Sequence, residues 1–133
     1  MTLTLKKRSL VPPLVLLSVA IVLTVSGELL LKQGMIRNGE LHLAPDTLVA
    51  SLAKLATNPF VLGGFALIFS GSIFWLSVIS QVPLSYAYPM LSTSYILVVG
   101  ASWLVLGEQI TWLRLAGVLV IMAGVSLVAR SGQ

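Results

Sequence analysis

Two ionisable residues stand one helical turn apart near the end of a long apolar stretch. Glu28 and Lys32 are separated only by leucines, and residues 14–23 before them are almost entirely apolar. A charged side chain in or near a bilayer is costly, so it is usually functional or within reach of water. Glutamate four residues before lysine is also the favourable order for attraction along a helix. The pair therefore predicts a functional site or an ion pair that satisfies itself.

The two members of this pair lie at different depths. In a helix that begins at Pro12, Glu28 lies ~24 Å and Lys32 ~30 Å along the axis. The side chain of Lys32 can thus extend into the lipid headgroups, whereas Glu28 is deeper and harder to solvate. We therefore expect a functional role for at least one of these two residues.

A stripe of hydroxyl groups and phenols follows one face of a later apolar stretch. Its members recur at helical spacing. They are Ser85, Tyr88, Ser92, Tyr95 and Ser102. The stripe predicts either the wall of a substrate cavity or a packing face, because small polar residues let membrane helices approach closely. Packing suits the serines, whereas a cavity suits the two bulky tyrosines in the middle of the span.

Two further residues belong with this stripe. Pro89 lies inside the same stretch and clashes with the carbonyl of Ser85, so a kink is expected beside the stripe. The kink serves either as a hinge for alternating access or only as a feature of helix shape. Trp75, in the preceding apolar stretch, is a further candidate for substrate binding among residues that mostly indicate helix packing.

The composition places the chain in a membrane. Of its 133 residues 57% are hydrophobic and only 9% are charged, against roughly 25% charged residues in a soluble domain. The mean hydropathy is +1.02. The net charge of +4 comes without a basic stripe interleaved with aromatic residues, which argues against a nucleic-acid partner. The absence of cysteine excludes disulfides and thiolate metal sites.

Four apolar stretches are long enough to cross a bilayer of ~30 Å hydrocarbon thickness. They cover residues 12–33, 59–80, 84–106 and 112–129. A shorter helix is expected over residues 47–56, with Asp46 as its N-cap and an apolar face that would lie in the membrane interface. The sequence therefore predicts an all-α membrane protein. Residues 1–133 form a single domain, a four-transmembrane-helix bundle with a short interfacial helix between the first two spans.

The basic residues indicate how the chain is oriented in the membrane, and two glycines indicate how its helices assemble. The cluster Lys6–Arg8 before the first span favours a cytoplasmic N-terminus. With that orientation, four basic residues lie on each side of the membrane, so insertion in both directions is also possible. Gly117 and Gly124 fall on one face of the last span and predict a helix–helix contact, within or between chains.

Signs of catalysis are missing from the sequence. His42 lies in the first loop, with no second histidine and no cysteine to complete a metal site. The sequence has neither a nucleophile elbow nor a phosphate-binding loop, and no two carboxylates share one helical face. We therefore expect a protein that is not an enzyme and that uses neither a cofactor nor a metal ion.

From about Leu14 to Ala129 the chain resembles the small multidrug resistance family and the wider drug/metabolite transporter superfamily. The resemblance is carried by residues 82–92 (VPLSYAYPMLS), by Leu106-Gly107-Glu108 and by the segment 117–124. The resemblance implies a transporter of four short spans, with Gly117 and Gly124 at a dimer interface.

Within that superfamily the chain is most similar to the small flippase subunits for aminoarabinose on undecaprenyl phosphate. Gly27-x-Leu29-x-x-Lys32-Gln33 and residues 87–92 (AYPMLS) carry this similarity. The resemblance implies a substrate that is a polyprenyl-phosphate-linked sugar and a place in the bacterial inner membrane. It also implies a homodimer or a heterodimer with a paralogue. Drug-exporting members carry a carboxylate two turns before the lysine, where this chain has Thr24, and a tryptophan where it has Leu91.

Three hypotheses follow from these observations. The leading hypothesis is a flippase in which Lys32, Arg37 or Arg114 meets the lipid phosphate and the hydroxyl stripe meets the sugar. The second is a proton-coupled exporter of small cationic drugs or metabolites, with Glu28 as the titrating carboxylate. The third is a membrane scaffold subunit that transports nothing, in which the stripe serves packing alone.

Overall fold

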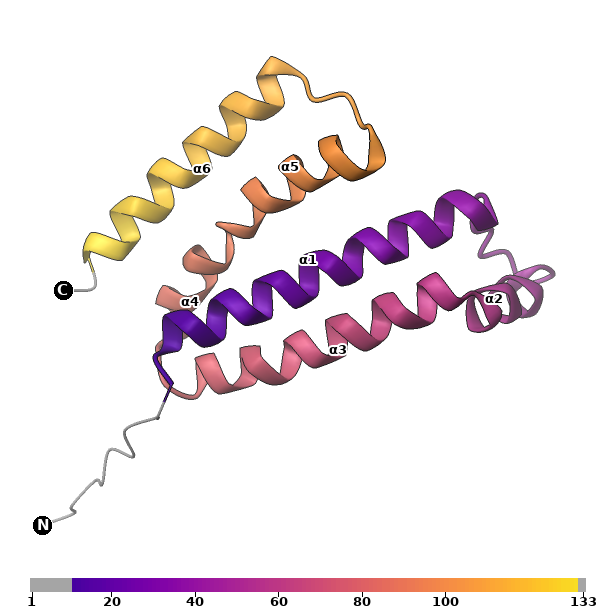
Figure 1. Cartoon of the computed structure of the whole chain (residues 1–133), viewed down its shortest axis with the longest axis horizontal. Coiled ribbons are helices and arrows are strands. Elements are labelled where there is room, and N and C mark those ends of the chain that lie inside the picture. Colours follow the sequence, from indigo (N-terminus) through magenta and orange to yellow (C-terminus); the bar gives the residue numbers. More distant parts are fainter. Residues whose placement is uncertain (1–10, 132–133) are drawn as a thin grey trace, which may run out of the picture.

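The computed structural model describes residues 11–131 and shows four long apolar helical spans with a short helix between the first two (Figure 1). No strand occurs within this range. The elements are α1 (Pro13–Asn38), α2 (Leu48–Thr57), α3 (Pro59–Ile79), α4 (Leu84–Leu91), α5 (Ser94–Leu106) and α6 (Trp112–Ser131). The predicted all-α architecture is confirmed. The basic cluster at residues 6–8 lies outside the described residues.

The helix ends follow local sequence signals. Pro13 and Pro59 occupy the first turns of α1 and α3, where a missing N–H costs nothing. The Asn58 side chain caps α3 by accepting hydrogen bonds from the amides of Phe60 and Val61. Gly39 and Gly107, with φ of 80° and 66°, follow the ends of α1 and α5 in a backbone region that disfavours other residues.

Helices α1 and α3 pack side by side along most of their length (Figure 1). Glycines permit this approach, because a methyl group added at Gly27 would lie 2.6 Å from the carbonyl oxygen of Gly64. At the N-terminal half of α1 a buried apolar cluster joins α1 to α3 and α4. It comprises Leu17, Ile21, Val25, Val78 and Ala87. The pair forms the most tightly packed part of the bundle; α2, α4 and α5 contact it, whereas α6 packs mainly against α4.

Two local predictions were wrong in detail. The first helix continues to Asn38, beyond the predicted end near Gln33, because Gly34 is buried against Val61 of α3 and packing extends the helix. The helix α2 begins at Leu48 with Thr47, not Asp46, at the N-cap position. Thr47 makes no capping bond, and its hydroxyl donates instead to the carbonyl of His42.

The third span is broken where the sequence predicted a continuous helix over residues 84–106. Pro89 lies within α4, and the helix stops at Leu91. Across the break the amides bond to carbonyls three residues earlier, including Thr93 N to Met90 O at 3.2 Å and Tyr95 N to Ser92 O at 3.1 Å. Such tight turns change the direction of the chain. The expected kink is present, and it divides the predicted stripe into two parts.

Candidate functional site

Polar side chains from α1 and from the end of α5 line a small hollow within an otherwise apolar bundle. The hollow has a volume of about 210 Å³. Its polar lining comes from Glu28 and Lys32 on α1, Ser102 on α5 and Glu108 just after α5. Val25, Leu29, Val98 and Leu106 complete the wall. We call this hollow the Lys32 site.

An ion pair joins the two sides of the Lys32 site. The Lys32 Nζ lies 3.8 Å from Oε1 of Glu108, and among the described residues this is the one ion pair within 4.0 Å. The two side chains are 55% and 38% exposed. The expected attraction between Lys32 and Glu28 within the helix is therefore not the contact that forms. Both glutamates line the hollow, and the lysine pairs with the one that faces it across the gap between helices.

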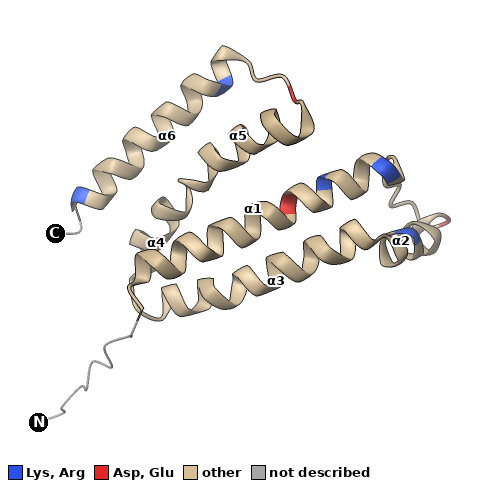
Figure 2. Ribbon diagram, viewed as in Figure 1, with Lys and Arg blue, Asp and Glu red and all other residues tan. Residues whose placement is uncertain are grey.

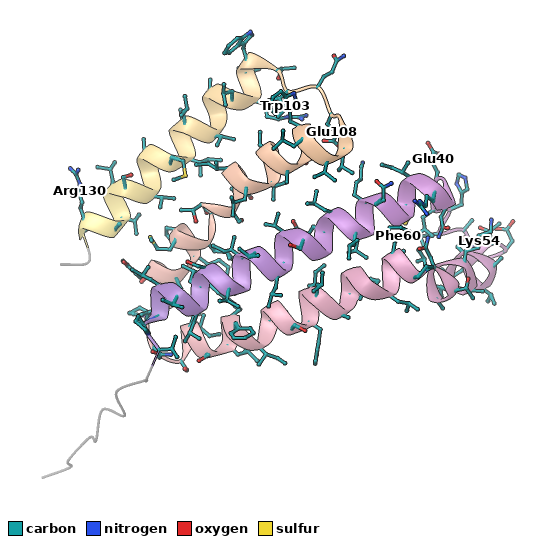
Figure 3. The ribbon with its side chains drawn as sticks, in the orientation of Figure 1. Glu40, Lys54, Phe60, Trp103, Glu108 and Arg130 are labelled. Atoms are coloured by element: carbon teal, nitrogen blue, oxygen red, sulfur yellow. The ribbon has the colours of Figure 1, made fainter. Side chains whose placement is uncertain are left out.

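Glu108 reaches the site because of the turn that ends α5. Gly107 adopts a left-handed conformation, and the amides of Gly107 and Glu108 both donate to the carbonyl of Ser102. The chain thereby folds back over the end of α5 and presents Glu108 beside α1 (Figure 3). The sequence indicates Glu108 only as part of the Leu106-Gly107-Glu108 motif, in the short linker between the third and fourth spans. The signal was available, because the predicted topology puts this linker at the same end of the bundle as Lys32.

Lys32 lies near one boundary of the membrane-spanning region. It is ~9 Å from the end of α1 at 1.5 Å per residue, and most of the other described cations share this end of the bundle (Figure 2). Clustered cations that flank apolar helices are typical of headgroup depth. An anion from the lipid surface can therefore reach Lys32 without crossing the apolar centre.

The stripe on the third span divides between two places. Tyr88 meets Trp75 of α3, with ring centroids 5.4 Å apart in an edge-to-face arrangement. Ser102 joins the Lys32 site on the other side of the break. Tyr95 and Ser85 are exposed, and the Ser92 hydroxyl donates to the Tyr88 carbonyl at 3.3 Å. The structure therefore brings together Tyr88 with Trp75 and Ser102 with Lys32, but no single wall contains all five residues.

The remaining predicted residues lie away from the Lys32 site. The Arg37 guanidinium lies over the Phe60 ring, 4.2 Å from its centroid, on the side of α1 that faces α3. Gly117 and Gly124 lie on α6, where an added methyl group at either position would meet nothing within 4 Å. Within residues 11–131 no three acidic, histidine or cysteine side chains gather in a way that suits a metal ion.

Four apolar helical spans, with a charged hollow between the first span and the end of the third, define a multi-pass membrane protein of the transporter class. The chain belongs to the EamA-like transporter family, which its residues 15–130 match. It is 39% identical over 113 residues to the probable 4-amino-4-deoxy-L-arabinose-phosphoundecaprenol flippase subunit ArnF of Erwinia tasmaniensis. That alignment covers 82% of this chain and 87% of the relative.

A second group of relatives matches over a shorter segment. The probable flippase subunit ArnE of Yersinia pestis, named for the same lipid-linked sugar, is 44% identical over 59 residues. This match covers 44% of the chain and 52% of the relative, so the aligned part spans about half of ArnE. No solved structure matches the chain. The resemblance drawn from the sequence motifs is confirmed at the level of the family.

Proposed function

We propose that the chain is a subunit of a flippase that moves a polyprenyl-phosphate-linked sugar across the bacterial inner membrane. The observation that carries the proposal is the Lys32 site, where a lysine at headgroup depth faces a carboxylate across a hollow. Similarity to proteins named as flippase subunits for 4-amino-4-deoxy-L-arabinose-phosphoundecaprenol supports this class of substrate.

The weak ion pair provides the first step of the mechanism. A half-exposed pair at 3.8 Å contributes only about 0–1 kcal/mol, so the lysine is readily exchanged between partners. A lipid phosphate offers several charged oxygens, and its hydrogen bonds to an ammonium group are short and strong. The phosphate therefore replaces Glu108 as the partner of Lys32, and the freed carboxylate can hydrate.

The polyprenyl chain and the sugar of the substrate lie in different surroundings during crossing. The polyprenyl chain stays in the hydrocarbon, because only the polar head pays a desolvation cost during crossing. Sugar hydroxyls can exchange hydrogen bonds with Ser102, and sugar C–H faces suit the exposed ring of Tyr88, which is held by Trp75. The break at residues 92–93 is the place where α4 can move relative to α5, which keeps Pro89 as the proposed hinge.

The active unit in this proposal is a dimer. One chain offers few polar groups, and α6 leaves Gly117 and Gly124 uncovered on its surface. Glycine notches of this kind let a second membrane helix approach closely. The partner is a second copy or a paralogue, and the basic cluster at residues 6–8 supports a cytoplasmic N-terminus.

The test is the Lys32→Ala variant in vesicles reconstituted from membranes of the producing cell, which retain any companion subunit. Loss of a hydrogen bond to a charged group costs about 1.5–3 kcal/mol, so translocation of the lipid-linked sugar should fall about 10- to 150-fold. Arg114→Ala is the matched control, because Arg114 lies near the start of α6 at the same end of the bundle. Undiminished translocation in Lys32→Ala would exclude the proposed function.

A further inference from the structure

A second basic hollow lies where α1, α2 and α3 meet. It has a volume of about 320 Å³ and contains Arg37 of α1 and Lys54 and Thr57 of α2, with Asn58 and Phe60 at the start of α3. Figure 3 shows Lys54 and Phe60 close together at this end of the bundle. Within residues 11–131 no carboxylate lines this hollow. We call it the Arg37–Lys54 site.

Arg37 is held with its hydrogen-bonding edge unused. Its guanidinium stacks on Phe60 at 4.2 Å, and this contact engages the face of the planar group rather than its N–H donors. Among the described residues Arg37 has no carboxylate within ion-pair distance. A stacked guanidinium with a free edge is well suited to bind two oxygens of a phosphate at once.

The other polar groups of the site are donors or are already engaged. Lys54 brings a second cation, again with no carboxylate within 4.0 Å among the described residues. Both polar atoms of the Asn58 amide are engaged, since its oxygen caps α3 and its nitrogen donates to the carbonyl of Gly34. The Thr57 hydroxyl donates to carbonyls of α2. Two unpaired cations therefore define the charge of the hollow.

An unpaired donor lies beside these cations. The side chain of Asn38 borders the Arg37–Lys54 site, and its Nδ2 is buried without a hydrogen-bond partner in the described part of the chain. Such an unsatisfied group is costly, and an acceptor oxygen that enters beside it would remove the cost. Glu40 and His42 line the adjoining hollow, which also contains Asn38 and Lys54, so one carboxylate lies close by without pairing with Lys54.

The Arg37–Lys54 site is distinct from the Lys32 site. Arg37 follows Lys32 by five positions, which rotates its side chain by ~140° around α1 and moves it ~7.5 Å along the axis. Lys32 faces α5 and the Glu108 turn, whereas Arg37 faces α3. A single phosphate group therefore cannot contact both cations.

We propose that the Arg37–Lys54 site binds a phosphate group at the membrane surface, separately from the transport site at Lys32. The chemistry that it recognises is a phosphate monoester or diester, carried either by a lipid headgroup or by a soluble phosphate. Stacking pre-orients Arg37, Lys54 supplies the second charge, and Asn38 supplies a neutral donor. This inference stands whether or not the chain is a flippase.

The experiment measures equilibrium binding to the full chain in a phosphorus-free maltoside detergent, in a Lys32→Gln background that removes the transport site. The three probes are undecaprenyl phosphate, undecaprenol and inorganic phosphate. We expect undecaprenyl phosphate to bind and to lose at least tenfold in affinity on adding Arg37→Gln and Lys54→Gln together. Undecaprenol should be unaffected. Arg37→Lys, which keeps the charge and loses the planar fork, should give an intermediate loss.

The outcomes separate the alternatives. Stronger binding of undecaprenyl phosphate than of inorganic phosphate identifies a lipid as the ligand, and equal binding identifies a soluble phosphate. Arg114→Gln is the control for general surface charge at the same end, because the structure places Arg114 in the lining of neither hollow, so it is no longer a candidate for the phosphate. The proposal is overturned if the double substitution leaves affinity unchanged, or if Arg114→Gln causes an equal loss. The proposal is likewise overturned if undecaprenyl phosphate binds the unaltered chain but not the Lys32→Gln background. That result would leave the transport proposal intact.

Discussion

The α1–α3 pair and the outer helix α6 carry the same glycine pattern in opposite surroundings. Glycines seven residues apart occur in α1 (Gly27, Gly34), α3 (Gly64, Gly71) and α6 (Gly117, Gly124). Those of α1 and α3 face the neighbouring helix, with an added methyl group 2.6–2.9 Å from the nearest atom. Those of α6 face open space within the chain. The first two pairs are covered by a neighbouring helix of the same chain, whereas the third is uncovered, as the proposed dimer contact requires.

The same two regions also differ in what they contribute: the α1–α3 pair contributes most to stability, and the α4–α6 half is the expected place of movement. The glycine-lined pair contains most of the buried residues, whereas α5 has none and α6 has two. The Lys32 site lies at the boundary, with α1 on the rigid side and the loosely packed α5 on the other. A site formed between a rigid and a loosely packed helix can open without unfolding the bundle. The α4–α6 half is therefore where we expect motion and subunit contact.

The largest expected effect comes from replacing a glycine that packs against the neighbouring helix with a larger residue. Gly27→Val should destabilise the chain by about 3 kcal/mol, the upper end of the overpacking range, because the nearest atom is a backbone oxygen that cannot move aside. The measurement is unfolding of the purified chain in detergent by titration with a denaturing detergent. Gly117→Val is the matched control and should leave subunit stability nearly unchanged while weakening dimer formation. Equal loss of stability in both variants would contradict the distinction between the α1–α3 pair and α6.

A smaller effect distinguishes the two helix caps. Asn58 is buried, caps α3 and also donates to α1, whereas Thr111 is exposed and caps only α6 by accepting from the Arg114 amide. Asn58→Ala should cost about 2 kcal/mol and Thr111→Ala about 0.5 kcal/mol, spanning the range measured for lost N-caps. The same detergent unfolding assay reports both values. A Thr111→Ala cost equal to that of Asn58→Ala would show that α6 contributes to subunit stability as much as α3.

The sequence predicted the fold well because membrane helices are set by length and hydropathy. The four apolar spans and the shorter apolar helix between the first two are all present in the structure. The errors came from interactions between helices. Burial of Gly34 against α3 extends α1, and turns after Pro89 break a span that periodicity alone treats as continuous. The spacing of the stripe assumed one straight helix, so its division between Trp75 and Lys32 was not predictable from offsets.

The candidate site was predictable in part. Lys32 and Glu28 were identified from the cost of charge in an apolar helix, and both line the hollow. The partner of Lys32 was missed, because attraction within a helix was considered and attraction across helices was not. Only the left-handed turn at Gly107 determines that Glu108 points back toward α1. A charged residue in a short linker at the same membrane end as an intramembrane lysine is the signal that would have found it.

The smallest predicted effect is the most specific, because removal of a side chain is expected to tighten ligand binding rather than weaken it. If lipid phosphate competes with Glu108 for Lys32, removing that carboxylate should tighten binding of undecaprenyl phosphate. An ion pair in the upper half of the range for exposed pairs contributes about 0.5–1 kcal/mol, which corresponds to a gain of about two- to fivefold. Glu40→Gln is the control, because Glu40 lies in the hollow beside α2 and does not line the Lys32 site.

The most direct test is therefore equilibrium binding of undecaprenyl phosphate and of undecaprenol to Glu108→Gln, Lys32→Gln and the unaltered chain. An Arg37→Gln and Lys54→Gln background removes the second basic hollow from the measurement. We predict tighter binding of the phosphate lipid in Glu108→Gln, weaker binding in Lys32→Gln and no change for undecaprenol. Unchanged or weaker binding in Glu108→Gln would contradict the exchange of partners at Lys32 on which the mechanism depends.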